Sequence, residues 1–280
     1  MNEFLSSRTF SRVRHWNSIR CSCGSISEQR ETESCDEESV LKTVWLISCS
    51  PSLFARRDSM TEAVIFDLDG TLVDSVDLNA QAWQETFRQF GREIPFPVLR
   101  HEIGKGADQL LPEFFSAEEL NKFGQELEKH RAGLYRRVYL PQVKAFPQVR
   151  ELFQCIRGDG KRIALASSAE EEEIQYYRSL INVDDLVQRE ASSDDVNRSK
   201  PAPDIFAAAL EHLGHMKPQN VVAVGDTPYD AEAAGKLHLR TVGLLCGGFA
   251  EQELRDAGSI AIFRDPAHLL ATYDRSPLNH

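Results

Sequence analysis

The sequence predicts an α/β fold built around a parallel β-sheet. Short, mostly apolar runs at 64–66, 162–166 and 221–224 indicate buried strands, because they are rich in strand-forming residues and too short for helices. Helical patterns separate the second and third runs, and strands that alternate with helices are typical of parallel sheets. Between the first two runs, by contrast, residues 77–143 contain only helical patterns. We therefore expect a sheet-containing core with a helical insertion.

The overall composition fits a globular, acidic protein. The chain has 280 residues, of which 41% are hydrophobic, enough for one large domain or two ordinary ones. Its 43 acidic and 32 basic residues give a formal net charge of −11, so no overall electropositive surface is available for nucleic acid or an anionic membrane. The longest apolar candidate, around 44–47, is far too short to span a bilayer. We expect neither a nucleic-acid nor a membrane partner.

Residues 1–60 are predicted to form a disordered extension outside the fold, because they lack sustained periodicity and are rich in Ser, Arg and Cys. Arginines among serines in residues 1–30 give a weak similarity to an organelle transit peptide, but the acidic patch at 28–38 argues against it. A leader, or a start codon placed ahead of Met60, is an equal alternative. Beyond this segment the two cysteines fit reduced, buried thiols, and we expect a cytoplasmic protein.

Two carboxylates follow the first predicted strand directly. Asp67 and Asp69 come at alternate positions after the apolar run, and Gly70-Thr71 follows them. In open α/β sheets, ligands bind outside the carboxyl ends of the strands. Two acidic side chains at such a place repel each other unless a cation lies between them, and Mg²⁺ is a hard cation that prefers oxygen ligands. The sequence therefore indicates a Mg²⁺ site at this edge of the sheet.

The insertion is predicted to be a set of helices connected by short loops. The helices are placed at 78–90, 97–103, 109–115 and 117–139. Ser116 and Glu119 have the spacing of a capping box at the start of the last helix.

A glycine-bracketed loop in the insertion carries Lys105. Gly104 and Gly106 would let the backbone approach a ligand closely, and Lys105 offers a point charge to a phosphate or carboxylate. A solvated turn between two helices is an equally good interpretation of this loop.

Two hydroxyl groups follow the second predicted strand. Ser167 and Ser168 come directly after 162–166, and a helix is expected from about Glu170. Hydroxyls next to the backbone N–H groups of a helix start suit a phosphate. A helix cap is the commoner reason for such a pair of serines.

A lysine precedes a stiff turn in the second half of the chain. Lys200 is followed by Pro201 and by a helix predicted over 204–213, so its amine is carried by restrained backbone. An ordinary surface lysine is the alternative interpretation.

Two aspartates follow the strand at 221–224. Asp226 comes after Gly225, and Asp230 lies at the start of a helix, where N-capping is an alternative role. Two more strands at 241–245 and 260–263 and a last helix at 267–273 complete the predicted core.

These four strand ends, in this order, resemble the four motifs of the haloacid dehalogenase (HAD) superfamily. The matching positions are Asp67-x-Asp69-x-Thr71, Ser167, the string Lys200-Pro-x-Pro-Asp-x-Phe, and Gly225-Asp226-x-x-x-Asp230. The resemblance implies a Rossmann-like core with a parallel sheet, formed by residues 61–76 and 144–280, and an inserted helical cap domain of the C1 type at 77–143.

The resemblance also implies a role for each group. Asp67 would be the nucleophile that forms an aspartyl-phosphate, Asp69 the general acid and base, and Lys200 a bridge between nucleophile and phosphoryl group. Mg²⁺ would be held by the Asp67 and Asp226 carboxylates and the Asp69 carbonyl, with Asp230 acting through water or by orienting Lys200. The further groups implied to bind phosphate or substrate are Thr71, Ser167, Ser168 and, in the cap, Lys105.

Among members of the superfamily, this chain is most similar to phosphatases. Asp69 argues against dehalogenases and phosphonatases, which lack the second aspartate of the first motif. Gly225 and the loop Gly104-Lys105-Gly106 depart from the pattern of β-phosphoglucomutases. We expect a phosphatase for a small phosphorylated metabolite, such as phosphoglycolate or a sugar phosphate, acting as a monomer or homodimer. A sugar-phosphate mutase and a catalytically idle binding protein are the alternatives.

Overall fold

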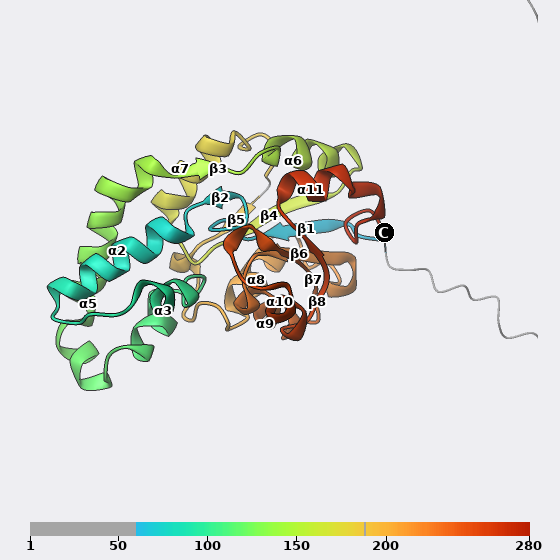
Figure 1. The fold of residues 1–280 in the computed structure, drawn as a ribbon. Coiled ribbons are helices and arrows are strands. Elements are labelled where there is room, and N and C mark those ends of the chain that lie inside the picture. The colour runs from blue at the N-terminus through green and yellow to red at the C-terminus, as the bar shows by residue number, and fades with distance from the viewer. Residues whose placement is uncertain (1–59, 188) are drawn as a thin grey trace, which may run out of the picture. The chain divides into compact units, whose positions relative to one another are not determined.

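The computed structural model describes residues 60–187 and 189–280, so the predicted extension at 1–60 lies, except for Met60, outside the described residues. The core is a six-stranded parallel sheet with the strand order β5-β4-β1-β6-β7-β8 (Figure 1). The strands are β1 (Ala63–Phe66), β4 (Arg162–Ala166), β5 (Arg189–Ala191), β6 (Val221–Gly225), β7 (Arg240–Leu244) and β8 (Ser259–Phe263). The predicted α/β class with a parallel sheet is confirmed.

The central strand β1 aligns the carboxyl ends of its two neighbours. Phe66 lies opposite Leu165 of β4 and Val224 of β6, so the residues after these three strands emerge at one edge of the sheet. Alternate residues of β1 belong to two separate buried clusters, Val64 and Phe66 to one and Ala63 and Ile65 to the other. Because both faces are covered, the strand is apolar throughout and fully buried.

Within residues 60–187 and 189–280, six core helices flank the sheet. They are α6 (Val149–Gly158), α7 (Glu171–Ile181), α8 (Asp204–His212), α9 (Pro228–Gly235), α10 (Glu251–Asp256) and α11 (Pro266–Ala271). Residues of α6, α7 and α11 join the cluster that contains Phe66, whereas residues of α8 and α9 join the cluster on the opposite face (Figure 1). The sheet is therefore the middle of three layers.

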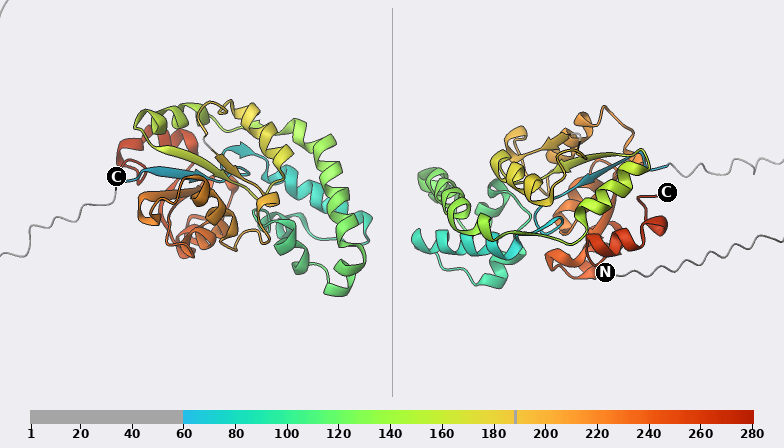
Figure 2. Two further views of the ribbon diagram at one scale, coloured as in Figure 1. Left: turned by 180° about the vertical axis from the view of Figure 1, so that it is seen from behind. Right: turned by 90° about the horizontal axis from the view of Figure 1, so that it is seen from above.

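The helical insertion begins and ends in a small two-stranded sheet. Strand β2 (Val73–Asp74) pairs antiparallel with β3 (Lys144–Ala145), which brings the two connections of the insertion side by side (Figure 2). Between them lie α2 (Val76–Gln89), α3 (Phe96–His101), α4 (Ala107–Leu110), a 3₁₀ turn η1 (Leu111–Glu113), α5 (Ala117–Leu134), a π-helical turn η2 (Tyr135–Tyr139) and a 3₁₀ turn η3 (Leu140–Gln142). We call residues 76–142 the cap segment. Its division from the core as a separate domain stays a prediction.

The cap segment has a buried cluster of its own. Phe87 is fully buried and forms edge-to-face contacts with Phe114 and Phe115. Ser116 and Glu119 form the predicted capping box at the start of α5. Among the described residues, none of the helices, including the 18-residue α5, has the length and apolarity needed to cross a membrane.

Several elements differ from the sequence prediction for local reasons. The helix predicted over 117–139 changes at Tyr135 from α-helical to π-helical winding, and the helix predicted over 109–115 changes to a 3₁₀ turn that contains Pro112. Strand β5 and helix α10 were not predicted. β5 has three residues, two of them charged, and α10 has six, so neither gives a recognisable periodic pattern.

Candidate active site

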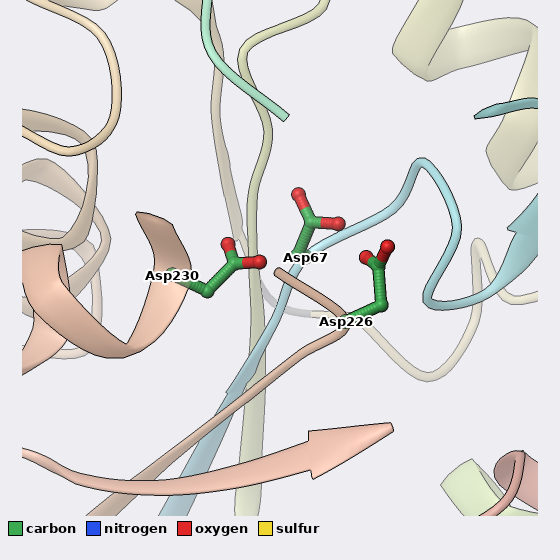
Figure 3. Close-up of side chains that lie close together, drawn as sticks. All are labelled: Asp67, Asp226 and Asp230. Atoms are coloured by element: carbon green, nitrogen blue, oxygen red, sulfur yellow. The ribbon is translucent and has the colours of Figure 1, made fainter. Parts of the chain in front are cut away.

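Three predicted aspartates meet at the carboxyl edge of the sheet (Figure 3). Asp67 follows β1, Asp226 follows β6, and Asp230 lies in the first turn of α9. One carboxylate oxygen from each lies within 4.8 Å of the others, and all three side chains are buried. The sheet register explains this meeting, because Asp67 and Asp226 extend strands that are hydrogen-bonded neighbours.

Lys200 supplies the positive charge beside these carboxylates. Its Nζ atom lies 2.8 Å from Asp230 Oδ1 and forms a second ion pair with Asp67 Oδ1, and the side chain is only 1% exposed. Although burial lowers the pKa of Lys200, the carboxylates of Asp230 and Asp67 raise it above its usual value, so the amine stays charged. Ionisation of all three aspartates would leave two negative charges in this buried place that Lys200 does not compensate.

Burial and the closeness of the carboxyl groups raise the pKa values of two of them. Burial raises the pKa of Asp226 well above its usual value, and the neighbouring Asp67 and Asp230 raise it further. Burial likewise raises the pKa of Asp67 to about 7, although Lys200 opposes the shift. A bound cation would favour the ionised carboxylates and reverse these shifts.

The surroundings of Asp226 fit a metal ligand. Its Oδ1 atom accepts a hydrogen bond of 2.7 Å from the Thr71 hydroxyl, whereas its buried Oδ2 atom has no hydrogen-bond partner among the described residues. The carboxylate lies against the backbone of Gly247, where any Cβ atom would overlap Oδ2. A buried carboxylate oxygen without a partner, beside two further carboxylates, is the environment expected for a hard divalent cation such as Mg²⁺.

Asp230 is better placed to hold protein groups than the metal. Its Oδ2 atom accepts hydrogen bonds from the backbone N–H of Thr227 (3.0 Å) and from the Thr227 hydroxyl (2.6 Å), and its Oδ1 atom pairs with Lys200. Thr227, not Asp230, is the N-cap residue of α9, and Asp230 completes the capping box. Of the two predicted roles for Asp230, the geometry favours the orientation of Lys200.

Asp69 points to a different set of partners. Its Oδ1 atom accepts hydrogen bonds from the Ser75 hydroxyl (2.5 Å), from Asn79 Nδ2 (3.0 Å) and from the Tyr177 hydroxyl (3.0 Å). Asp69 nevertheless lines the same cavity as Asp67. Sequence analysis did not single out Asn79 or Tyr177, because a lone polar residue on a helix gives no signal of its own.

The three predicted hydroxyl groups have different surroundings. Thr71 is fully buried, and its hydroxyl lies 3.0 Å from Asp67 Oδ2 as well as 2.7 Å from Asp226 Oδ1, which suits it to orient the two carboxylates rather than to contact phosphate. Ser167 is also fully buried, and its hydroxyl accepts a hydrogen bond from the backbone N–H of Ala169. Ser168 lines the cavity instead. Phosphate binding by these three residues stays a prediction.

Two adjoining cavities lie between the aspartates and the cap segment. The inner one, about 60 Å³, is lined by Asp67 and Asp69, and the outer one, about 340 Å³, by residues of the cap and of core loops. Both are lined by Trp83, Lys105, Arg131 and Ser168. A small molecule with its phosphate near Asp67 would therefore extend toward the cap segment.

The predicted glycine-bracketed loop lies directly on the core. A Cβ atom at Gly104 would come within 2.7 Å of Thr227, and one at Gly106 within 2.5 Å of Ser199. The backbone N–H of Gly106 also donates a hydrogen bond to the Ser199 hydroxyl (2.8 Å). In this structure the two glycines allow the cap segment to approach the core, which is a different use from the predicted approach to a ligand.

Lys105 is not a free charge. Its amine forms ion pairs with Glu102 and with Glu113, the latter at 3.0 Å, and lies 5.0 Å from the ring centre of Tyr229. The residue lines both cavities, as the predicted contact with substrate requires, but two carboxylates already compensate its charge.

Arg131 is a second cation at the cavities, and sequence analysis did not find it. It pairs with Asn79 Oδ1 and, at 3.4 Å, with Glu173, and its guanidinium lies over the rings of Trp83 and Tyr135. Glu173 is only 2% exposed, and burial raises its pKa to about 7 despite the opposing effect of Arg131. One arginine in the middle of a helical pattern looks like any surface residue, so only the packing of α5 on the core shows its position.

Comparison with known proteins gives a consistent set of relatives. A family model described as haloacid dehalogenase-like hydrolase matches residues 64–244. A phosphorylated carbohydrates phosphatase of Thermotoga maritima is 26% identical over 72% of this chain and 94% of its own length. A phosphoglycolate phosphatase of Nitrosospira multiformis is 30% identical over 62% of this chain and 78% of its own length. The crystal structure of a hydrolase from Pseudomonas syringae superposes with a TM-score of 0.69 at 28% identity, covering 76% of this chain and 98% of that one.

We predict that Gly247→Ala weakens binding of Mg²⁺. The new Cβ atom would overlap Asp226 Oδ2, so the Asp226 carboxylate must move from its present position near the Asp67 carboxylate. Isothermal titration calorimetry with Mg²⁺ should show a loss of affinity of about 10- to 100-fold, the range typical of a disturbed ligand environment. Gly235→Ala on α9 is the matched control, because a Cβ atom there would contact nothing within 4 Å. Equal affinities in both variants would contradict the assignment of Asp226 as a ligand.

We also predict that Glu173→Gln removes a pH dependence of stability. Burial raises the pKa of Glu173 from 4.5 to about 7, so between these pH values the folded state binds more protons than the unfolded state. The free energy of unfolding contributed by this residue must then fall as the pH rises through this window, by about 3 kcal/mol. Urea unfolding at pH 4.5 and pH 7.5 measures the difference between wild type and variant. Glu172→Gln, an exposed neighbour on α7, should leave the wild-type dependence unchanged.

Proposed function

The chain is a phosphatase of the haloacid dehalogenase-like hydrolase family, and we propose that it hydrolyses a small phosphorylated metabolite with Mg²⁺ and an aspartyl-phosphate intermediate. The observation that carries the proposal is the placement of Asp67 and Asp69 on one cavity, with Lys200 paired to Asp67. A nucleophile, an acid and a cation for the phosphoryl oxygens are the groups that such a reaction needs.

In the first step an oxygen of Asp67 attacks phosphorus while the bond to the leaving group breaks. Asp69, initially protonated, gives its proton to the departing alkoxide. The product alcohol leaves, and the phosphoryl group remains on Asp67. Lys200, with Ser167 or Ser168, would hold its oxygens.

In the second step water attacks the phosphorus of the aspartyl-phosphate. Asp69, now ionised, takes a proton from this water, and the bond between phosphorus and the Asp67 oxygen breaks to release phosphate. Both residues thereby return to their starting states. Mg²⁺ held by the Asp67 and Asp226 carboxylates and the Asp69 carbonyl would supply the positive charge that offsets repulsion between the carboxylate and the phosphate ester.

A phosphatase is favoured over a sugar-phosphate mutase by the residue before Asp226. A Cβ atom at Gly225 would come within 2.5 Å of Asp230, so the acidic residue that mutases carry at this position would displace the Asp230 carboxylate. A catalytically idle binding protein is disfavoured because all of the charged groups are present and paired as catalysis requires. The relatives named for phosphorylated carbohydrates and phosphoglycolate suggest the two substrate classes to test first.

We predict that the protein releases phosphate from a panel of phosphorylated metabolites only when Mg²⁺ is present. Asp67→Asn should abolish release, because an amide is no nucleophile toward phosphorus. Asp69→Asn should lower it by about 10²–10⁴-fold, the usual contribution of general acid–base catalysis, and acid quenching should trap some phosphoenzyme. Malachite green detection of phosphate and labelling from a ³²P substrate measure the two effects.

The controls separate the alternatives. Asp256→Asn, an exposed residue of α10, should retain full activity. Formation of glucose 6-phosphate from β-glucose 1-phosphate without net release would indicate a mutase. Full activity of Asp67→Asn would exclude the aspartyl-phosphate mechanism.

A further inference from the structure

Two buried tyrosines connect the cap segment to Asp69. Tyr177 of α7 donates a hydrogen bond to Asp69 Oδ1 (3.0 Å), so its own oxygen is left to accept one from Tyr135 of η2, whose hydroxyl lies 2.6 Å away. Both side chains are fully buried. Water therefore cannot replace either hydrogen bond, and each hydroxyl depends on the other.

Asn79 closes these contacts into a ring. Its Nδ2 atom donates to Asp69 Oδ1 (3.0 Å) and lies 3.3 Å from the Tyr135 hydroxyl, while its Oδ1 atom accepts from Arg131. The ring therefore runs from Asp69 through Tyr177, Tyr135 and Asn79 back to Asp69. Because Asn79 and Tyr135 belong to the cap segment, the ring is complete only when that segment lies on the core.

The ring uses one oxygen of Asp69 and leaves the other. All three donors, Ser75 included, reach Oδ1, and no described residue donates a hydrogen bond to Oδ2. A carboxyl group held in this way has a fixed plane, with one oxygen available to carry the transferred proton. Burial and the charge of Asp69 raise the pKa values of both tyrosines, so both remain protonated donors.

We propose that Tyr135 and Tyr177 are positioning residues for proton transfer by Asp69, and that they make its alignment conditional on contact between cap and core. The inference rests on the proposed phosphatase function. Tyr177 acts on Asp69 directly, and Tyr135 acts through Tyr177 and Asn79. Neither is a catalytic residue, since neither lines the cavities.

The inference predicts a dependence on the leaving group. Phenolate is a poorer leaving group than p-nitrophenolate, so phenyl phosphate needs protonation by Asp69 more than p-nitrophenyl phosphate does. The leaving group departs in the first step, which kcat/KM reports. We expect Tyr177→Phe to lower kcat/KM about tenfold for phenyl phosphate, part of the 10²–10⁴-fold contribution of a general acid, and less than about twofold for p-nitrophenyl phosphate.

Two further variants test whether Tyr135 acts on Asp69 through Tyr177. Tyr135→Phe should change the ratio of the two kcat/KM values in the same direction. The double variant should lose less than the combined losses of the two single variants, because the Tyr135 hydroxyl acts partly through Tyr177. Tyr139→Phe is the matched control. Tyr139 lies in the same π-helical turn and donates to Glu85 at 3.0 Å, away from Asp69, so its loss should leave the ratio unchanged.

The outcomes are distinguishable. Equal losses on both substrates, or an unchanged ratio in Tyr177→Phe with an unchanged melting temperature, would overturn the positioning role. Additive effects of the two substitutions would overturn the path from Tyr135 through Tyr177. A wild-type protein that hydrolyses neither ester in the presence of Mg²⁺ would overturn the proposed function itself, and with it this inference.

Discussion

The arrangement of the site depends on the repulsion between carboxylates buried at one edge of the sheet. Asp67, Asp226 and Asp230 are buried close together, and Lys200 can compensate only one of their charges. Such an arrangement is costly in the folded protein unless a further cation enters. Each carboxylate is accordingly held by rigid neighbours, such as Thr71 between two of them and the capping box around the third. A cation site here would offset this cost.

The residues of this charged cluster could be predicted from the sequence because each follows a strand or a stiff turn. Apolar runs identify β1, β4 and β6, and their parallel register then places Asp67, the serines and Asp226 together. The remaining site residues could not be found in this way. Asn79, Arg131 and Tyr177 lie inside helices, where a polar residue is ordinary. Their partners come from other parts of the fold, Asp69 after β1 for Asn79 and Tyr177 and Glu173 of α7 for Arg131.

The loop around Lys105 shows that the role of a loop cannot always be predicted from the sequence of that loop alone. Two glycines beside a lysine are compatible with a ligand loop, and also with close contact between two parts of one chain. The structure distinguishes these possibilities by what surrounds each glycine, which is Thr227 on one side and Ser199 on the other. Because Ser199 immediately precedes Lys200, this contact also joins the cap segment to the loop that carries the buried lysine.

The charges around the cavities are consistent with the proposed metal, even though three cationic side chains lie near Asp67 and the cap segment. Lys200, Arg131 and Lys105 each already pair with at least one carboxylate, so none brings a net positive charge to the site. A phosphate dianion that enters this acidic chain would meet a cluster of three carboxyl groups with a single lysine beside them. A divalent cation held by Asp67 and Asp226 would offset that repulsion, and Lys200 could then be shared between Asp67 and the phosphoryl oxygens.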